Sequence, residues 1–286
     1  MIKKGIILSG GKGTRMSPLT KAVNKQLLPI YDKPLIYYPL SILMLANIRD
    51  ILIIVNKGQL SQYKKILPNG DNLGIKISYK EQASPKGLPE AFVLGEKFIA
   101  KDNVALILGD NFFYGQNLTQ QLKKNTMLKK GARIILHKVI KPELYGVAKI
   151  NSNNKVLNIK EKPKKYISDL AITGLYFFDN NVVKYAKKLK PSKRGELEIV
   201  DLINIYKKKK NLSADLIGRG GAWLDTGSIE DFYKTSAFVS AIENRQGFKI
   251  ACLEEIALNN KWINKGNIQK AIKFYGNCEY SNYLKK

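Results

Sequence analysis

Short apolar runs alternate with amphipathic stretches over the first half of the chain. The apolar runs are mostly contiguous, which is typical of parallel strands buried on both faces of a sheet. They predict strands at residues 4–8, 50–55, 75–79, 103–111 and 133–139. The segments between them predict helices at residues 34–45, 59–67, 90–98 and 117–130, with Pro34 at the first helical position of the first one. This alternation indicates an α/β fold built on a doubly wound, mostly parallel sheet.

The pattern changes after residue 139, where short strands become more frequent. Strands are predicted at residues 145–150, 156–163, 171–178 and 212–218, and a helix at 229–245. The first two of these strands flank the polar turn 151–154 (Asn-Ser-Asn-Asn), which indicates a hairpin. We therefore expect one domain over residues 1–245, with a β-rich part inserted at about 141–227, and a small helical C-terminal appendage over residues 246–286.

Length and composition are those of an ordinary soluble globular protein, with 286 residues, 44% apolar and 25% charged. No apolar stretch is long enough to span a membrane, and the N-terminus lacks the pattern of a signal peptide. The two cysteines, Cys252 and Cys278, do not have metal-ligand spacing, so we expect free thiols, a cytoplasmic location and no membrane partner. The single histidine, His137, falls inside a predicted strand and is interpreted as structural.

The formal net charge of +26 raises the hypothesis of a nucleic-acid partner. Most of the basic residues are lysines, however, and they are scattered along the chain instead of forming stripes. The cluster from Lys207 to Lys210 ends a predicted helix, where cations are favoured by the helix dipole. A codon bias toward lysine, asparagine and isoleucine explains the same composition, and we expect no nucleic-acid partner.

A glycine-rich turn follows the first predicted strand and is the first candidate for chemistry. Gly10, Gly11 and Gly13 leave little side-chain bulk, so backbone N–H groups can approach an anion, and Thr14 and Arg15 add a hydroxyl and a guanidinium. The stretch does not match the Walker pattern, and the dinucleotide pattern fails because its last position is Met16. Taken alone, the glycines are equally consistent with a tight turn of no chemical function.

Ten residues further on, the stretch Asn-Lys-Gln-Leu-Leu-Pro-Ile at 24–30 places Lys25 in an apolar context. At this spacing the two motifs, Gly-Gly-Lys-Gly-Thr-Arg and Asn-Lys-Gln-Leu-Leu-Pro, resemble the sugar-nucleotide pyrophosphorylases, and most closely the branch that uses dTTP and glucose 1-phosphate. Enzymes of this family join a nucleoside triphosphate to a sugar 1-phosphate and release pyrophosphate. Further family motifs follow in order up to residue 247, so the resemblance covers most of the chain.

The resemblance implies a role for individual residues of this sequence. Nucleotide-binding residues are implied at Gly10, Gly11, Gly13, Thr14, Arg15, Lys25, Gln26, Gln82, Gly87 and Asp110. Sugar-phosphate-binding residues are implied at Asn111, Gly146, Glu161, Lys162, Ile172 and Arg194. Catalytic roles are implied for Arg15, Lys25, Lys162 and Arg194, and Mg²⁺ would be held by Asp110 and Asp225. A regulatory nucleotide site between subunits is implied near Tyr114, Gly115 and Arg219, although residues 117–120 depart from its pattern.

From the residues alone, several of these positions keep another reading. Asp110 follows a buried strand, where a carboxylate is either a ligand or a cap for the next segment. Glu161 and Lys162 are equally an exposed pair at a strand end, and Gln82 an incidental residue of a loop. Asp225 precedes a predicted helix and is also placed to cap it.

The resemblance predicts a Rossmann-like nucleotidyltransferase with a nucleotide-binding part at about 1–140 and a sugar-phosphate-binding part at about 141–227. It also implies a homotetramer that supplies dTDP-glucose for deoxysugars of the dTDP-rhamnose type in cell-surface polysaccharide. A related enzyme that uses UTP or CTP would keep the phosphate-binding residues and change the base loop. A nicotinamide dehydrogenase is excluded because its third glycine and its acidic residue are missing, and a nucleic-acid-binding module remains a remote alternative.

Overall fold

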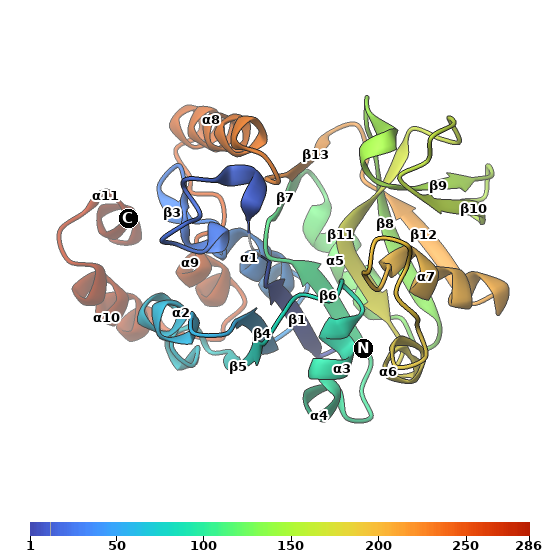
Figure 1. The fold of residues 1–286 in the computed structure, drawn as a ribbon. Helices are drawn as coiled ribbons and strands as arrows, with labels where there is room; N and C mark the ends of the chain where they lie inside the picture. The colour runs from blue at the N-terminus through green and yellow to red at the C-terminus, as the bar shows by residue number, and fades with distance from the viewer. Residues whose placement is uncertain (12) are drawn as a thin grey trace.

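The computed structural model describes residues 1–11 and 13–286, and its centre is a nine-stranded sheet (Figure 1). The parallel part of the sheet consists of β6 (Val104–Leu108), β1 (Lys4–Ser9), β4 (Asp50–Asn56) and β5 (Lys76–Gln82), in that order. Strand β5 lies at the edge, as its alternating pattern predicts. These strands of the first half are therefore confirmed, and they run parallel because crossover connections that contain helices join them.

The other side of the sheet is mixed, and the long strand β11 (Leu170–Phe178) organises it. Strand β11 runs antiparallel to β6, to β8 (Ala132–Lys138) and to β9 (Gly146–Ile150). The predicted hairpin is formed by β9 and β10 (Val156–Glu161), while β12 (Leu212–Leu216) runs parallel to β8. This β-rich part adds a second wall beside the parallel strands.

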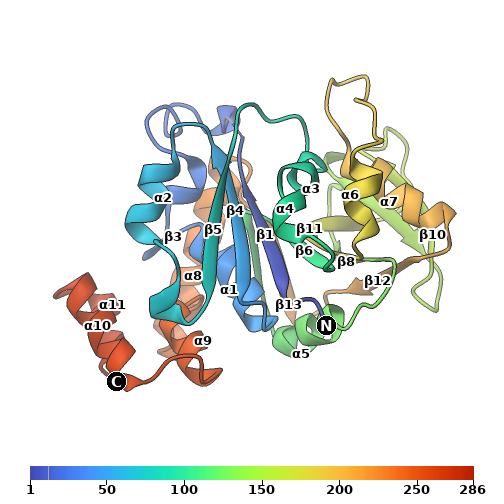
Figure 2. The same ribbon diagram turned by 90° about the horizontal axis from the view of Figure 1, so that it is seen from below.

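Helices cover both faces of the sheet (Figure 2). They are α1 (Tyr37–Leu45), α2 (Leu60–Ile66), α3 (Glu90–Leu94), α4 (Glu96–Ile99), α5 (Leu118–Thr126), α6 (Asn181–Ala186) and α7 (Ile199–Lys208). Within β4, Ile51 and Ile53 pack with α1 and α2 in one core cluster, whereas Leu52 and Ile54 pack with α3, α6 and α7 in another. The doubly wound architecture is confirmed, with one hydrophobic core on each face.

Three local expectations are corrected by the structure. Helix α1 begins at Tyr37 and not at Pro34, which belongs to β3 (Lys33–Pro34), the partner of β2 (Pro29–Ile30). The helix expected at 90–98 is divided into α3 and α4 at Gly95, where a Cβ would lie 3.0 Å from Ile6 Cδ1. The strand expected at 103–111 ends at Leu108, and Asn111 begins a separate strand.

That separate strand, β7 (Asn111–Gly115), pairs with β13 (Gly221–Asp225) in a two-stranded antiparallel ribbon that the sequence pattern did not predict. The register places Asp225 opposite Asn111. Two segments more than a hundred residues apart in sequence are therefore joined directly beside the carboxyl end of β6.

The C-terminal part of the chain is helical, as expected. It contains α8 (Ile229–Gln246), α9 (Leu253–Asn259), α10 (Lys265–Tyr275) and α11 (Glu279–Leu284). Leu253 and Ala257 of α9 pack in the same core cluster as α1, which buries α1 on all sides instead of along a single face.

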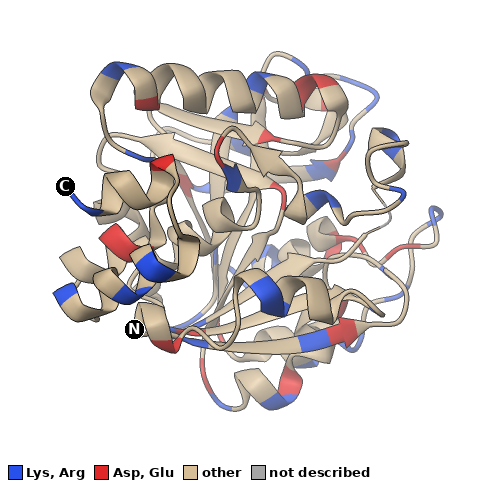
Figure 3. Cartoon of the chain, turned by 90° about the vertical axis from the view of Figure 1, so that its left-hand side faces the viewer, with Lys and Arg blue, Asp and Glu red and all other residues tan. Residues whose placement is uncertain are grey.

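In the view of Figure 3, Lys and Arg are spread over many elements. Among the described residues, no helix is both long and apolar enough to cross a membrane.

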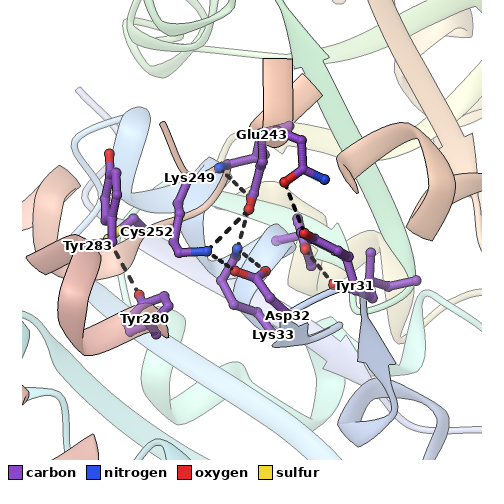
Figure 4. Close-up of polar contacts among 12 residues, drawn as sticks. Tyr31, Asp32, Lys33, Glu243, Lys249, Cys252, Tyr280 and Tyr283 are labelled. Atoms are coloured by element: carbon purple, nitrogen blue, oxygen red, sulfur yellow. Dashed lines mark hydrogen bonds and ion pairs between the residues drawn. The ribbon is translucent and has the colours of Figure 1, made fainter. Parts of the chain in front are cut away.

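A buried cluster of four charged residues fastens the β2–β3 hairpin to this C-terminal part (Figure 4). Lys33 is only 2% exposed, and its ammonium pairs with Asp32 and, at 2.9 Å, with Glu243 of α8. Lys249 pairs with Asp32 and lies 3.5 Å from Glu243, whose Oε1 also accepts the backbone N–H of Ile250 at 2.8 Å. Two cations and two carboxylates balance one another, so the cluster holds the elements together without excess charge.

Replacing Lys33 with methionine is expected to destabilise the protein by about 3–5 kcal/mol, because two buried carboxylates would share a single lysine. The measurement is urea unfolding followed by circular dichroism. The matched control is Lys76→Met on the exposed face of β5, where a change within about 0.5 kcal/mol is expected. Equal stabilities of the two variants would contradict the structural role of the cluster.

Candidate active site

A cleft of about 450 Å³ opens at the carboxyl ends of the parallel strands, where doubly wound sheets bind their ligands. Its lining comes from both parts of the sheet and brings together residues that are far apart in sequence. Of the predicted site residues, the cleft is lined by Gly10, Gly11, Arg15, Gln82, Gly87, Asp110, Asn111, Gly146, Glu161, Lys162, Ile172, Arg194 and Asp225. Gly13, Thr14, Lys25 and Gln26 are not part of its lining.

The glycine-rich loop leaves β1 and turns sharply over the end of the sheet. Gly13 has a φ of 59°, in the left-handed region, and begins the short 3-10 turn Thr14–Met16 that carries Arg15. The Thr20 hydroxyl donates to Gly13 O at 2.7 Å and fixes the turn. Lys12, a member of the motif, lies outside the described residues.

Lys25 reaches the cleft through an ion pair with Asp110, the residue that follows β6 by two positions. The short 3-10 turn Lys25–Leu27 is capped by Asn24, whose Oδ1 accepts the Gln26 N–H and the Tyr63 hydroxyl, both at 2.9 Å. Burial opposes the ionisation of Asp110, but the adjacent Lys25 outweighs this effect and holds the carboxyl pKa below its usual range. The Gln26 side chain is buried.

Asp225 is brought beside Asp110 by the β7–β13 ribbon. The residue after it, Thr226, donates its backbone N–H and its hydroxyl to Asp110 O, at 3.2 and 2.8 Å. Burial, followed by the negative charge of Asp110, raises the pKa of Asp225 to about 6, although Lys25 and Arg15 partly offset the increase. A Cβ built on Gly227 would lie 3.0 Å from Arg15 Nη2 and 3.2 Å from Asp225 Oδ1, so the guanidinium lies near this carboxylate.

The opposite wall carries the residues predicted for the sugar phosphate. A Cβ built on Gly146 would lie 3.0 Å from Glu161 Oε2, so the glycine makes room for this carboxylate. Lys162 directly follows β10 with a φ of 39°, an unfavourable conformation for lysine, and its N–H donates to Tyr145 O at 3.0 Å. Burial and the neighbouring Glu198 raise the pKa of Glu161, against the effect of Arg194 and Lys162.

Glu198 is a member of the site that the sequence motifs did not single out. Arg194 donates to both of its carboxylate oxygens, at 3.1 and 2.7 Å, and also to Glu161 at 3.3 Å. Burial opposes the ionisation of Glu198, but hydrogen bonds from Arg194 and Ser192 outweigh it and lower the carboxyl pKa. The spacing of four residues between Arg194 and Glu198 is the one signal in the sequence that suggests this pair.

Asn111 and Gln82 use most of their polar groups within the protein. Asn111 Oδ1 accepts Trp223 Nε1–H at 2.6 Å and Gly174 N–H at 3.0 Å, while its Nδ2 donates to Asp110 Oδ1 at 3.1 Å. Gln82 ends β5 and does not belong to the following loop. Its Nε2 donates to Glu90 at 2.6 Å, and its Oε1 packs against Gly10 without a hydrogen-bond partner among the described residues.

The loop after β5, which contains Gly87, touches the segment just before α7, which contains Leu197. Gly87 has a φ of 109° and forms a parallel bridge with Leu197, whose N–H donates to Lys86 O at 2.7 Å. A side chain at position 87 would collide with the Leu197 backbone. The positive φ and this close approach both require glycine.

The residues predicted for a regulatory site lie away from the cleft. Tyr114 and Gly115 line a separate pocket of about 190 Å³ together with Gly218 and Gly220. Arg219 lies between these two glycines in the chain but is not part of the lining.

His137 packs against Trp223 with ring centroids 6.2 Å apart, which agrees with a structural role.

The nucleotidyl transferase family matches residues 4–242 of the chain. A glucose-1-phosphate thymidylyltransferase of Neisseria meningitidis is 50% identical over 281 residues, 98% of either chain, and one of Mycobacterium tuberculosis is 42% identical over 98% of this chain and 97% of the relative. The chain belongs to the glucose-1-phosphate thymidylyltransferase family. It is therefore a nucleotidyltransferase, and the fold and family predicted from the sequence are confirmed.

Solved structures share the overall fold of this chain. A glucose-1-phosphate thymidylyltransferase structure from Bacillus anthracis, solved with a sucrose, has a TM-score of 0.76 at 39% identity and covers 82% of this chain and 94% of its own. A UDP-glucose pyrophosphorylase solved with UDP-glucose has a TM-score of 0.73 at 27% identity, covering 86% of this chain and 100% of its own. Members of the family thus share this arrangement of a parallel sheet with an antiparallel flank.

Asp225→Asn is expected to stabilise the metal-free protein at neutral pH, and the gain is expected to vanish as the pH falls to about 4. The folded-state pKa of about 6 exceeds the ordinary 3.8. Ionisation of Asp225 therefore favours the unfolded chain, with no penalty below the lower value and a full penalty above the higher one. The measurement is the thermal midpoint against pH in the presence of a chelator, with the exposed Asp201→Asn as control. Parallel pH profiles for the unsubstituted protein and Asp225→Asn would contradict the assignment.

Proposed function

We propose that the protein joins dTTP and α-D-glucose 1-phosphate to give dTDP-glucose and pyrophosphate. The observation that carries the proposal is the single cleft in which Arg15, Asp110 and Asp225 face Glu161, Lys162 and Arg194. The first group suits a nucleoside triphosphate and a cation, and the second suits a phosphorylated sugar. The nucleotide would lie against residues of about 1–140 and the sugar phosphate against residues of about 141–227.

The main physical problem of this reaction is to bring two polyanions together. Each pair of unit charges about 4 Å apart costs roughly 4 kcal/mol at an effective dielectric constant near 20. Arg15 and Lys25 on the triphosphate, with Lys162 and Arg194 on the sugar phosphate, supply four cations against this repulsion. The sugar-phosphate oxygen then attacks the α-phosphorus in line and pyrophosphate leaves, so positioning and electrostatics carry the catalysis.

Asp110 and Asp225 fit a Mg²⁺ ion. Lys25 pairs with only one of these two half-buried carboxylates. Burial, followed by the negative charge of Asp110, raises the pKa of Asp225, and Lys25 and Arg15 offset only part of the increase. Within the described residues no cluster of three or more acidic, histidine or cysteine side chains is placed to hold a metal. Two carboxylates completed by phosphate oxygens and water are the usual environment of Mg²⁺. When bound, the ion would offset charge on the transferred phosphate.

The base loop supports a pyrimidine that carries an N3–H group. Glu90 Oε2 accepts one hydrogen bond from Gln82 Nε2 at 2.6 Å and one from the Lys86 backbone N–H at 3.0 Å. The Gln82 side-chain oxygen has no hydrogen-bond partner among the described residues. Thymine and uracil offer a donor at N3, whereas cytosine offers an acceptor there. A UTP-dependent activity is the second candidate, favoured by the likeness to a UDP-glucose pyrophosphorylase structure.

We further infer a cytoplasmic homotetramer that feeds deoxysugar synthesis for surface polysaccharide. Ile229 and Tyr233 support the oligomer, because they are one turn apart on α8 and are 48% and 71% exposed. Such apolar side chains are common at subunit interfaces. Light scattering of the purified protein tests this, and a monomeric mass would contradict it.

The function is tested by incubating the protein with Mg²⁺, glucose 1-phosphate and each nucleoside triphosphate in turn while pyrophosphate is measured. dTTP is expected to give the highest rate, UTP a lower one, and CTP, ATP and GTP very little. Removal of divalent cations with a chelator is expected to stop the reaction. Absence of pyrophosphate release with both dTTP and UTP would refute the proposal.

Lys25→Ala and Asp225→Ala are each expected to lower the rate of pyrophosphate release by about a hundredfold or more, since each removes a charge placed beside the reacting phosphates. Thermal unfolding checks that both variants are folded. The matched control is Lys64→Ala on the exposed side of α2, which should keep the full rate. A folded Lys25→Ala or Asp225→Ala protein with full activity would remove that residue from the mechanism.

A further inference from the structure

Asn56 is the last residue of β4, the strand next to β1 in the sheet. The β1–β4 ladder ends with the pair formed by Ser9 and Val55. Asn56 therefore lies one position beyond the ladder, beside the point at which β1 passes into the glycine-rich loop. Its side chain is half-buried and belongs to none of the motifs that define the site.

The Asn56 side chain makes two reciprocal hydrogen bonds with the backbone of a single glycine. Its Oδ1 accepts the Gly11 N–H at 3.0 Å, and its Nδ2 donates to Gly11 O at 2.8 Å. The side-chain amide thus takes the place of the peptide group of a neighbouring strand. It continues the pairing of β1 and β4 for one residue into the loop, at a place where the backbones have already separated.

Side-chain packing does not hold Gly11. Its φ is 111°, a conformation that other residues rarely adopt, and a Cβ built on it would have no described atom within 4 Å. Gly13, two residues further on, is held separately by the Thr20 hydroxyl. Asn56 and Thr20 are therefore the two side chains that fix the described glycines at either end of this turn.

The geometry also determines which part of the loop faces an anion. Because the Gly11 N–H is donated to Asn56, it is not available to a phosphate oxygen. Later in the loop, the cleft is lined by Arg15, which offers its guanidinium N–H groups. These groups bind a polyphosphate only if the turn that carries them keeps its orientation, since a misplacement of about 1 Å is costly in sites of this kind.

We propose that Asn56 is a positioning residue which, through the Gly11 peptide, sets the affinity for the polyphosphate part of the nucleotide. The inference rests on the proposed function. It predicts a selective effect. Ligands that share the β- and γ-phosphate region, dTTP and pyrophosphate, depend on Asn56, whereas glucose 1-phosphate, bound on the opposite wall, does not.

The test is Asn56→Leu, which keeps a similar volume and removes both polar groups. The KM values for dTTP and, in the reverse reaction, for pyrophosphate are each expected to rise about tenfold, because two hydrogen bonds are lost. The KM for glucose 1-phosphate is expected to stay within about twofold, because a substitution has little effect on a distant subsite that shares no contacts with it. The control is Asn153→Leu at the exposed tip of the β9–β10 turn, which should leave all three values unchanged.

Unchanged KM values for dTTP and pyrophosphate would overturn the proposal. So would an equal rise in all three KM values, which indicates a general structural role. If Asn56→Leu does not fold, Asn56→Ser replaces it, because a serine hydroxyl is too short to reach both Gly11 groups, and the same selective rise is expected. Calorimetric titration with inorganic pyrophosphate and Mg²⁺ separates the two proposals. Weaker binding by the variant supports the role of Asn56 even if the unsubstituted protein releases no pyrophosphate from dTTP, and equal binding refutes it.

Discussion

The arrangement of the cleft depends on the contact between Lys25 and Asp110 next to a second carboxylate, Asp225. Two acids at this depth repel one another, and one lysine compensates only one of them. The surrounding structure keeps all three groups in place. Asn24 caps the turn that carries Lys25, Asn111 donates to Asp110, and Thr226 ties the strand of Asp225 to the Asp110 backbone. Arg15 lies near Asp225 and offsets part of its charge as well. The fold thereby holds two adjacent carboxylates at the place where we propose that Mg²⁺ binds.

Residues 25–33 connect the ion pair of the cleft with the buried charge cluster at the C-terminal part. At one end Lys25 pairs with Asp110 in the cleft. At the other end Lys33 belongs to the cluster with Glu243, in which two cations and two carboxylates cancel. Between them, Ile36 N–H donates to Gln26 O and Leu35 N–H to Leu28 O, which closes the segment into a compact loop. The balanced cluster therefore anchors the element that carries Lys25, and it couples the C-terminal helices to the geometry of the cleft.

The sequence predicts most of the sheet, because contiguous apolar runs bounded by turns identify buried parallel strands without knowledge of their partners. The β7–β13 ribbon is missed because its strands cannot be recognised without knowledge of their partners. Each of its strands has five residues, and only their pairing across the chain gives them regular structure. Helix α1 is predicted with a single apolar face, but α9 packs on it from the C-terminus and buries all sides. The glycine-rich and lysine motifs predict residues of the cleft, because Gly10, Gly11 and Arg15 line it and Lys25 pairs with Asp110 in its wall. Asn56 carries no such signal, since it acts on Gly11, a residue 45 positions away, and for Glu198 the only signal is its spacing of four residues from Arg194.

Arg194 has two carboxylate neighbours before any ligand arrives, Glu198 at 2.7 Å and Glu161 at 3.3 Å. A sugar phosphate that engages this guanidinium must displace or share an anion that is already there, so the event is an exchange of counter-ions. Such an exchange returns little net free energy compared with the capture of a phosphate by an isolated arginine. On the function proposed above, the same guanidinium would release a bound product as readily as it accepts the substrate.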